Sequence, residues 1–292
     1  MRARSTKPGS LGLFGVVLAA LLFVRSIPIL AHDAKPAEQP LPEKPSAREL
    51  LEQGVEAYKR NDFDAAIVLF QKAKEADPTL VIARLYLATA YANLYIPGVT
   101  DEKNVAQAKQ AIEEFRGALE LDPKNIPAID GIGSLVFNLA SNPYDEQKMM
   151  ESRSFHLKHI ELKPDDPEAY YWVGLIDWTV SFKANAGLRR QYTPAEGAPP
   201  LKDGDPLPAA LCARFQAQYG STIDDGIEAL KKAIQLRPDY DDAMAFLNLL
   251  YRQKADEFTT EEDRERYLQM ADDLIIKIKD LKVKAAQKQS PQ

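Results

Sequence analysis

The chain of 292 residues has a single cysteine, Cys212, and only three histidines. One cysteine cannot form an internal disulfide, and it excludes iron–sulfur clusters, cysteine-rich zinc sites and haem attachment through paired cysteines. A serine–histidine–aspartate triad would have to use His32, His156 or His159, and none of these has the sequence surroundings of such a site. We therefore predict no catalytic site, no metal site, no cofactor and no enzymatic activity.

Positive charge is also scarce, because 37 lysines and arginines are outnumbered by 43 aspartates and glutamates, for a formal net charge of −6. Residues 1–31 contain four bases and no acid, so the remaining chain is more acidic still. Nucleic acids and anionic lipids attract basic surfaces, and we expect neither as the main partner. The 45% of hydrophobic residues is typical of a globular protein.

The N-terminus has the order of features that an export signal needs. Three basic residues precede an uncharged run at residues 11–24. As a helix this run is too short to span the roughly 30 Å hydrocarbon core of a membrane, but its length is typical of the apolar region of a signal peptide. We predict that residues 1–31 are a signal peptide cleaved after Ala31, or an uncleaved anchor in which residues 9–31 hold the protein at the inner membrane. Both predict a periplasmic or secreted protein. Residues 32–46 contain four prolines and are predicted to be a linker.

A repeated pattern begins after this linker. Apolar residues recur at helical spacing on both sides of a break at Asn61-Asp62, which predicts two antiparallel helices. Small residues at Gly54 and Ala66 allow the helices to approach closely, and Phe70 fills the space between them. The spacing of the second helix, Ala66-Phe70-Ala73-Pro78, recurs at Ala111-Phe115-Ala118-Pro123, Ser152-His156-His159-Pro164 and Gly226-Leu230-Ala233-Pro238.

Over roughly residues 47–282 this pattern resembles the tetratricopeptide repeat (TPR) family, and the chain also resembles uncharacterised exported bacterial members of it. The resemblance implies an all-α, right-handed solenoid of about five antiparallel helix pairs. We place the units at about 47–80, 81–125, 126–166, 167–240 and 241–282, followed by a polar basic tail at 283–292.

The fourth unit is about 40 residues longer than the first, which places an insertion at residues 181–221. We predict two helical pieces in it, an extension of the first helix to about Arg190 and a segment from Pro208 to Tyr219. Long loops in compact repeats are usually functional or disordered. Apolar residues on one face of the second piece predict that it docks: Leu207, Leu211, Phe215 and Tyr219. Our hypothesis is that the insertion forms a lid over the concave face of the solenoid.

The resemblance implies that the first helix of each pair lines the concave side. On these helices a stripe with i, i+4, i+7 spacing lies apart from the residues that face the second helix. We predict a partner-binding face made of these stripes and an adjoining polar column: Leu51, Val55, Tyr58, Leu85, Thr89, Asn93, Phe137, Asn138, Tyr171 and Trp178. Family members that bind a C-terminal carboxylate carry lysine, arginine and asparagine at the positions of Leu51, Val55, Leu85 and Thr89. An apolar peptide or helix is therefore the expected ligand.

Two alternatives apply to the fourth unit. Residues 170–176 are apolar or glycine throughout, and such a helix is covered on every side, so Tyr171 and Trp178 could pack beneath the insertion. These two side chains and Tyr192 could instead enclose a small molecule. The sequence thus predicts a protein- or peptide-binding scaffold of the cell envelope, with small-molecule binding as the alternative. It leaves the oligomeric state open.

His156 and His159 are one helical turn apart and could bind a metal ion or sense pH. They occupy, however, the positions held elsewhere by Phe115 and Ala118, which face the partner helix. We interpret both histidines as structural, and Cys212 as a packing residue of the insertion.

Overall fold

The computed structural model describes residues 44–194, 200–202 and 204–289. These residues form ten α-helices and no β-strand, which confirms the all-α prediction. The predicted signal peptide or anchor and all but the end of the predicted linker lie outside the described residues. In the part of the chain described, no helix is both long and apolar enough to cross a membrane.

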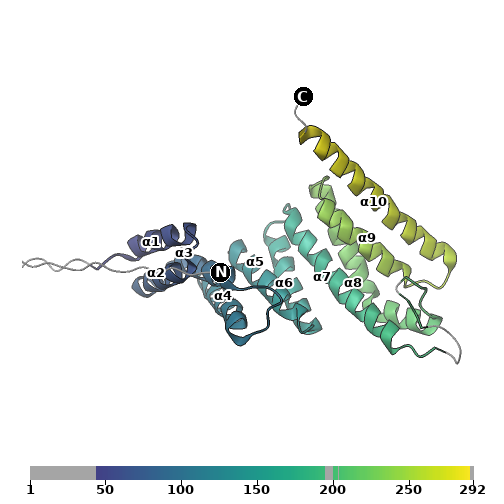
Figure 1. The fold of residues 1–292 in the computed structure, drawn as a ribbon, viewed down its shortest axis with the longest axis horizontal. Coiled ribbons are helices and arrows are strands. Elements are labelled where there is room, and N and C mark those ends of the chain that lie inside the picture. Colours follow the sequence, from purple (N-terminus) through teal and green to yellow (C-terminus); the bar gives the residue numbers. More distant parts are fainter. Residues whose placement is uncertain (1–43, 195–199, 203, 290–292) are drawn as a thin grey trace, which may run out of the picture. The chain divides into compact units, whose positions relative to one another are not determined.

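The helices follow one another as five antiparallel pairs within one compact unit that begins at Pro45 (Figure 1). We call the odd-numbered members first helices and the even-numbered members second helices. The pairs are α1 (Ala47–Lys59) with α2 (Phe63–Ala76), α3 (Val81–Leu94) with α4 (Glu102–Leu121), α5 (Ile126–Ser141) with α6 (Glu146–Leu162), α7 (Pro167–Gln191) with α8 (Ala209–Leu236), and α9 (Asp241–Ala255) with α10 (Glu261–Gln289).

Side-chain caps explain where several helices begin. Ser46 and Glu49 form a capping box at α1, in which each side chain accepts a hydrogen bond from the other residue's backbone N–H. Asp62 and Asp145 accept from the third residue beyond them and start α2 and α6. These caps accept hydrogen bonds from otherwise unpaired N–H groups of the first turn, and they thereby stabilise the start of each helix.

Close backbone approach fixes the register of each pair. Gly54 of α1 lies against the ring of Phe70, which is fully buried. Gly133 of α5 lies against His156, and a Cβ atom on this glycine would come within 2.7 Å of the imidazole Nε2. A methyl group at either glycine would push the helices apart, so the small residues predicted from the repeat are required by packing.

Successive pairs stack so that the first helices are the more closely spaced set. α1 contacts α3, α3 contacts α5 and α7 contacts α9, whereas the second helices make no comparable contacts with one another in the described chain. The second helices α2, α4, α6 and α8 each contact both their own partner and the next first helix. The closely spaced side of such a stack is the side that curves inward, and we call it the first-helix face.

The insertion of the fourth unit is part of the core. α7 and α8 are extended to 25 and 28 residues, and Pro208 directly precedes α8. The segment predicted from Pro208 to Tyr219 is therefore continuous with the second helix and is not a separate piece. Leu207, Cys212 and Phe215 are buried in a hydrophobic cluster that also contains residues of α9 and α10, so the predicted docking of this segment is confirmed.

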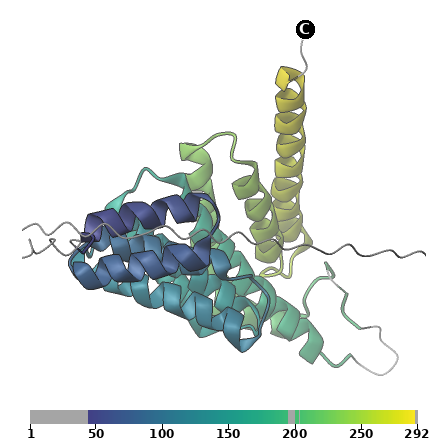
Figure 2. The same cartoon turned by 60° about the vertical axis from the view of Figure 1, so that its left-hand side comes forward.

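The last helix continues beyond the predicted end of the solenoid at Lys282. α10 runs to Gln289, and its C-terminal end extends past α9 in both views (Figures 1 and 2). Lys282 lies 3.9 Å from Asp241 at the start of α9, which marks where the overlap of the two helices ends. Residues 283–289 are thus helical, whereas the sequence indicated a tail.

Candidate functional site

The ten residues predicted to bind a partner lie on all four of the first helices to which they were assigned, α1, α3, α5 and α7. None of them is buried: Asn93 is exposed and the other nine are half-buried. Most of these side chains pack against the core with one side and keep the other side accessible. This is the condition that a binding face needs, since it offers apolar contact without loss of fold stability.

At the N-terminal end of the face, aromatic rings join α1 to α3. The Tyr58 ring meets Tyr86 edge-on at 6.3 Å between centroids, and Asn93 Nδ2 donates 2.8 Å hydrogen bonds to Tyr58 Oη and to the Thr89 carbonyl. The Asn93 amide nitrogen, expected from the sequence to be available to a partner, is therefore engaged within the protein. Leu51, Val55 and Tyr86 help to line a hollow of about 870 Å³ beside α1.

In the middle of the face, Phe137 of α5 packs edge-on against Trp172 of α7 at 5.5 Å. Trp172 also stacks on His156, with ring centroids 5.0 Å apart and planes within 4°. Trp172 lies one position beyond the stripe residue Tyr171, so the sequence analysis did not assign it to the face. The contacts of Trp172 with Phe137 and His156 come from the preceding helix pair, α5 and α6, and no sequence pattern within the fourth unit predicts them.

At the C-terminal end, the rings of Tyr171 and Trp178 are packed by the fifth unit. Tyr171 lies 5.1 Å from Tyr240 and 5.8 Å from Phe246 between ring centroids. Trp178 lies 5.2 Å from Phe246 and stacks on Phe182 at 5.3 Å. Packing thus explains much of the burial of both side chains. The rings are covered by Tyr240, the N-cap residue of α9, by Phe246 of α9 and by Phe182 of α7.

A pocket of about 360 Å³ lies at this end of the face, between α7, α9 and the start of α10. Trp178 and Phe182 form an aromatic wall, and Gly204 of the insertion closes one side. The full lining is Trp178, Phe182, Asn185, Ala186, Arg189, Gly204, Leu249, Arg252, Gln253, Asp256, Arg264 and Leu268. The described part of the insertion therefore borders the first-helix face at this pocket, both through the extension of α7 and through Gly204.

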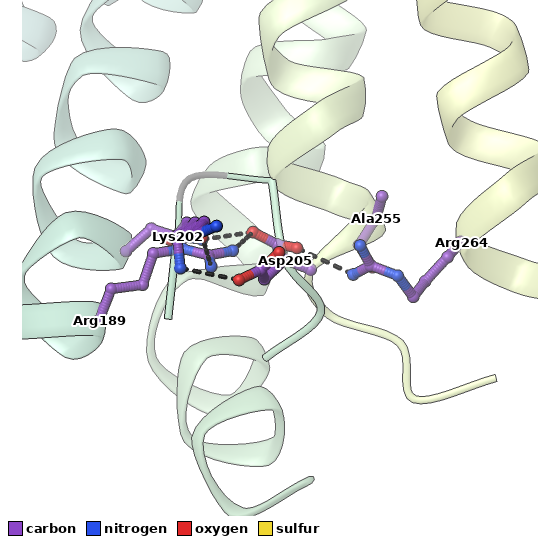
Figure 3. A network of polar contacts seen from close by, with 7 residues as sticks. Arg189, Lys202, Asp205, Ala255 and Arg264 are labelled. Atoms are coloured by element: carbon purple, nitrogen blue, oxygen red, sulfur yellow. Dashed lines mark hydrogen bonds and ion pairs between the residues drawn. The ribbon is translucent and has the colours of Figure 1, made fainter. Parts of the chain in front are cut away.

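A buried polar network holds the insertion against the turn between α9 and α10 (Figure 3). Asp256 accepts hydrogen bonds from Arg189 Nη2 at 2.6 Å, Arg264 Nη1 at 2.9 Å and Asn185 Nδ2 at 2.9 Å. Arg189 Nη1 also donates to the Lys202 carbonyl at 2.8 Å, while Asp205 Oδ2 accepts from the Lys202 backbone N–H. The Asp256 carboxylate thus joins α7 to α10, and Arg189 extends the network to the loop of the insertion at Lys202.

Tyr192, the third residue proposed to enclose a ligand, lines a different cavity of about 520 Å³ with Pro200 and Leu201. Tyr171 lines neither this cavity nor the pocket beside Trp178. The three aromatic residues therefore do not surround one site. Of the three, Trp178 alone lines the pocket between α7, α9 and the start of α10.

His156 and His159 lie between α5, α6 and α7. His156 is fully buried, and burial together with the nearby charge of His159 lowers its pKa to about 4. His159 Nδ1 lies 2.8 Å from Asp130 Oδ1, whose pKa burial raises while the bond to His159 opposes that shift. Within the described ranges, no three histidine, cysteine or acidic side chains are placed to hold a metal ion.

Other buried carboxylates are paired with basic residues across neighbouring helices. Asp177 accepts from Arg153 Nε at 2.7 Å and from Nη2 at 3.0 Å, although burial still raises its pKa to about 6. Glu114 accepts from Lys74 at 2.5 Å and from Arg84 at 3.1 Å. Lys74–Glu114 and Arg153–Asp177 join successive units, and Arg84–Glu114 joins the two helices of one unit, so these groups have structural partners that explain their burial.

No protein-family model matches the chain. The RNA polymerase-associated protein CTR9 of Caenorhabditis elegans is 26% identical over 177 residues, which cover 58% of this chain and 14% of that protein. The chain thus spans only a small part of the length of this relative. A solved structure of MamA from Desulfovibrio magneticus RS-1 (residue 41 to the end) has a TM-score of 0.53 at 16% identity, covering 84% of this chain and 97% of that one.

The TPR protein YrrB has a TM-score of 0.50 at 16% identity, covering 83% of this chain and 92% of that chain. At this level of identity the likeness concerns the fold. Together with the five stacked helix pairs it confirms the predicted fold, an all-α solenoid like those of TPR proteins.

Proposed function

We propose that the chain is a non-enzymatic scaffold that binds a peptide or a helix of a partner protein on its first-helix face. The observation that carries this proposal is the row of half-buried apolar and aromatic side chains, which runs from Leu51 on α1 to Trp178 on α7. Aromatic residues on rigid helices provide large contact areas at little cost in side-chain entropy. YrrB, which shares the fold, is described as having an unusual peptide-binding site.

The absence of an enzymatic role is part of this proposal. Buried ionisable groups mark active sites when they have no structural explanation. Here Asp177, Glu114 and Asp256 each accept hydrogen bonds from arginine or lysine side chains that join helices. His156 occupies a helix-packing position, and its ring stacks on Trp172.

The proposal includes a place of action in the cell envelope. Its support is the order of basic, uncharged and small residues in residues 1–31. We propose a periplasmic or secreted protein, tethered to the inner membrane if the segment is not cleaved. Fractionation of the native host, with the mass of the mature protein, tests this part. A cytoplasmic protein of full mass would contradict it.

The binding proposal is tested by cross-linked co-purification from the native host. We compare the tagged wild type with a Leu85→Glu/Phe137→Glu variant, which places two charges on the face. The matched control is Val68→Glu/Leu157→Glu, because these apolar residues lie on second helices with 49% and 37% exposure. All three proteins must first show similar thermal unfolding, since Leu85 and Phe137 also contact the core.

We expect a partner that is recovered with the wild type and the control but lost from the Leu85→Glu/Phe137→Glu variant. Loss from the control alone would place binding on the second helices and contradict the proposal.

The pocket beside Trp178 supports a second candidate function, the binding of a small molecule between the fourth unit and its insertion. Its volume of about 360 Å³ lies within the range of small-ligand sites, and its lining combines aromatic and polar groups. The test is thermal unfolding of the protein with and without small-molecule extracts of the host. A stabilising fraction that has no effect on Trp178→Ala would support it.

A further inference from the structure

The pocket between α7, α9 and the start of α10 has an unusual balance of charge. Three arginines line it, Arg189, Arg252 and Arg264, together with a single acid, Asp256. Arg189 and Arg264 are buried, with 9% and 8% exposure. Two buried guanidinium groups thus share one carboxylate, and this trio carries one net positive charge (Figure 3).

Neighbouring acids do not place a second negative charge in the pocket lining. Glu257 pairs with Lys254 at 2.9 Å, and neither side chain lines the pocket. Asp272 pairs with Arg252 at 2.6 Å, but its side chain is 61% exposed and lies outside the lining. An exposed pair of this kind is weak, so Arg252 can exchange this partner for a ligand at little cost.

The remaining lining groups indicate what else a ligand would contain. Trp178 and Phe182 stack at 5.3 Å and, with Leu249 and Leu268, form an apolar wall. The Gln253 Oε1 atom is buried without a hydrogen-bond partner. A buried acceptor without a donor is costly, and an N–H or O–H group on a ligand would satisfy it.

We propose that this pocket binds an organic anion in which a carboxylate is joined to an apolar ring and a hydrogen-bond donor. Arginine binds carboxylates with charge-assisted, often paired hydrogen bonds, and rings stack favourably on an aromatic wall. This inference rests on the small-molecule function proposed above and specifies the chemistry of its ligand. A free organic acid and the C-terminus of a peptide both supply this chemistry.

The experiment is isothermal titration of the full chain with N-acetylphenylalanine and with N-acetylphenylalaninamide. The two probes have the same ring and the same amide N–H, and they differ in the charge of the terminal group. We expect the acid to bind about tenfold to a hundredfold more tightly than the amide. A tetrapeptide that ends in phenylalanine, used as the acid and as the amide, distinguishes a free organic acid from a peptide C-terminus as the natural ligand. If the tetrapeptide acid binds more tightly than N-acetylphenylalanine, the ligand is a peptide C-terminus.

Variants assign the binding to this pocket. Arg252→Gln is expected to lower the affinity for the acid about tenfold and to reduce its advantage over the amide by the same factor. Arg237→Gln is the matched control, because Arg252 and Arg237 have side chains 41% and 40% exposed and each pairs with one carboxylate. The Arg237 pair lies outside the pocket, so this variant should bind like the wild type.

The outcomes distinguish a failure of the anion inference from a failure of the small-molecule function on which it rests. Equal binding of acid and amide would overturn the anion inference and leave small-molecule binding in place. No binding of either probe at millimolar concentration would overturn both. An acid preference that persists undiminished in Arg252→Gln would show that the acid binds elsewhere and would overturn the assignment of this pocket.

Discussion

At the scale of single residues, His156 is a titratable side chain at a position of the repeat that packs one helix against its partner. It occupies a position that Phe70 and Phe115 occupy in the first two units, and it is fully buried between Gly133 and Trp172. An aromatic hydrocarbon at this position is insensitive to pH, whereas a buried imidazole must stay neutral. The fold therefore holds His156 in its uncharged form.

This burial predicts that acid destabilises the protein. The pKa of His156 is lowered to about 4 in the folded state, whereas the unfolded chain takes up the proton near pH 6.5. The stabilising contribution is thus complete above about pH 7 and is lost as the pH falls from 6.5 toward 4. Over the interval from pH 7 to pH 4.5 the loss amounts to about 2 kcal/mol, measured by urea unfolding at these two pH values.

The control for this effect is His156→Phe, which restores the residue type of the first two units. Asp130 and Asp177 also titrate with raised pKa values, so the comparison between the two proteins isolates the histidine. The free energy of unfolding should fall less in the variant over the same interval. An equal fall in both proteins would show that other groups cause the acid sensitivity.

Phe70 tests the repeat register itself. It is fully buried against Gly54, and Phe70→Ala should lower the free energy of unfolding by about 3–5 kcal/mol because it leaves a cavity. Val68 lies on the same helix with 49% exposure, so Val68→Ala should cost less than about 1 kcal/mol. Chemical denaturation measures both, and similar losses would contradict the packing described.

At the scale of elements, the insertion is the feature that departs most from a regular repeat. Its helical pieces were predicted from periodicity, because amphipathic spacing is a local property of the sequence. The contact between Arg189 and Asp256 could not be predicted from periodicity, because these residues are 67 positions apart and meet only when the fourth and fifth units stack. Lone charged residues in a sequence carry no sign of such a partner.

The network around Asp256 predicts a large effect of a small change. Asp256→Asn removes the charge that two buried arginines share, and we expect a loss of about 3–5 kcal/mol in the free energy of unfolding. Hydrogen exchange should rise first in residues 200–202 and 204–208 and at the start of α10. Asp272→Asn, at an exposed pair, should change stability by less than about 1 kcal/mol.

A result in which both substitutions have the same small effect would show that the insertion is held by its apolar residues alone. Leu207 and Phe215 are buried in the same region, so this is the competing explanation.

At the scale of the whole repeat unit, the pattern of small residues and prolines was sufficient to predict five helix pairs. It did not predict which side chains meet across pairs. Tyr171 packs against Tyr240, Trp172 against His156 and Trp178 against Phe246, and each contact depends on the angle between successive units. The sequence was thus sufficient to assign the ten residues to first helices, whereas their degree of burial and their partners required the structure.

The central claim is that the first-helix face binds a partner protein, and site-specific photo-crosslinking tests it most directly. A photoreactive benzoylphenylalanine is placed at Asn93, which is exposed on α3, or at Leu157, which is 37% exposed on α6. Both sites accept a larger side chain without disturbing the core. We predict that irradiation in the native host links a partner to position 93 and not to position 157. Crosslinking at position 157 alone would contradict the account.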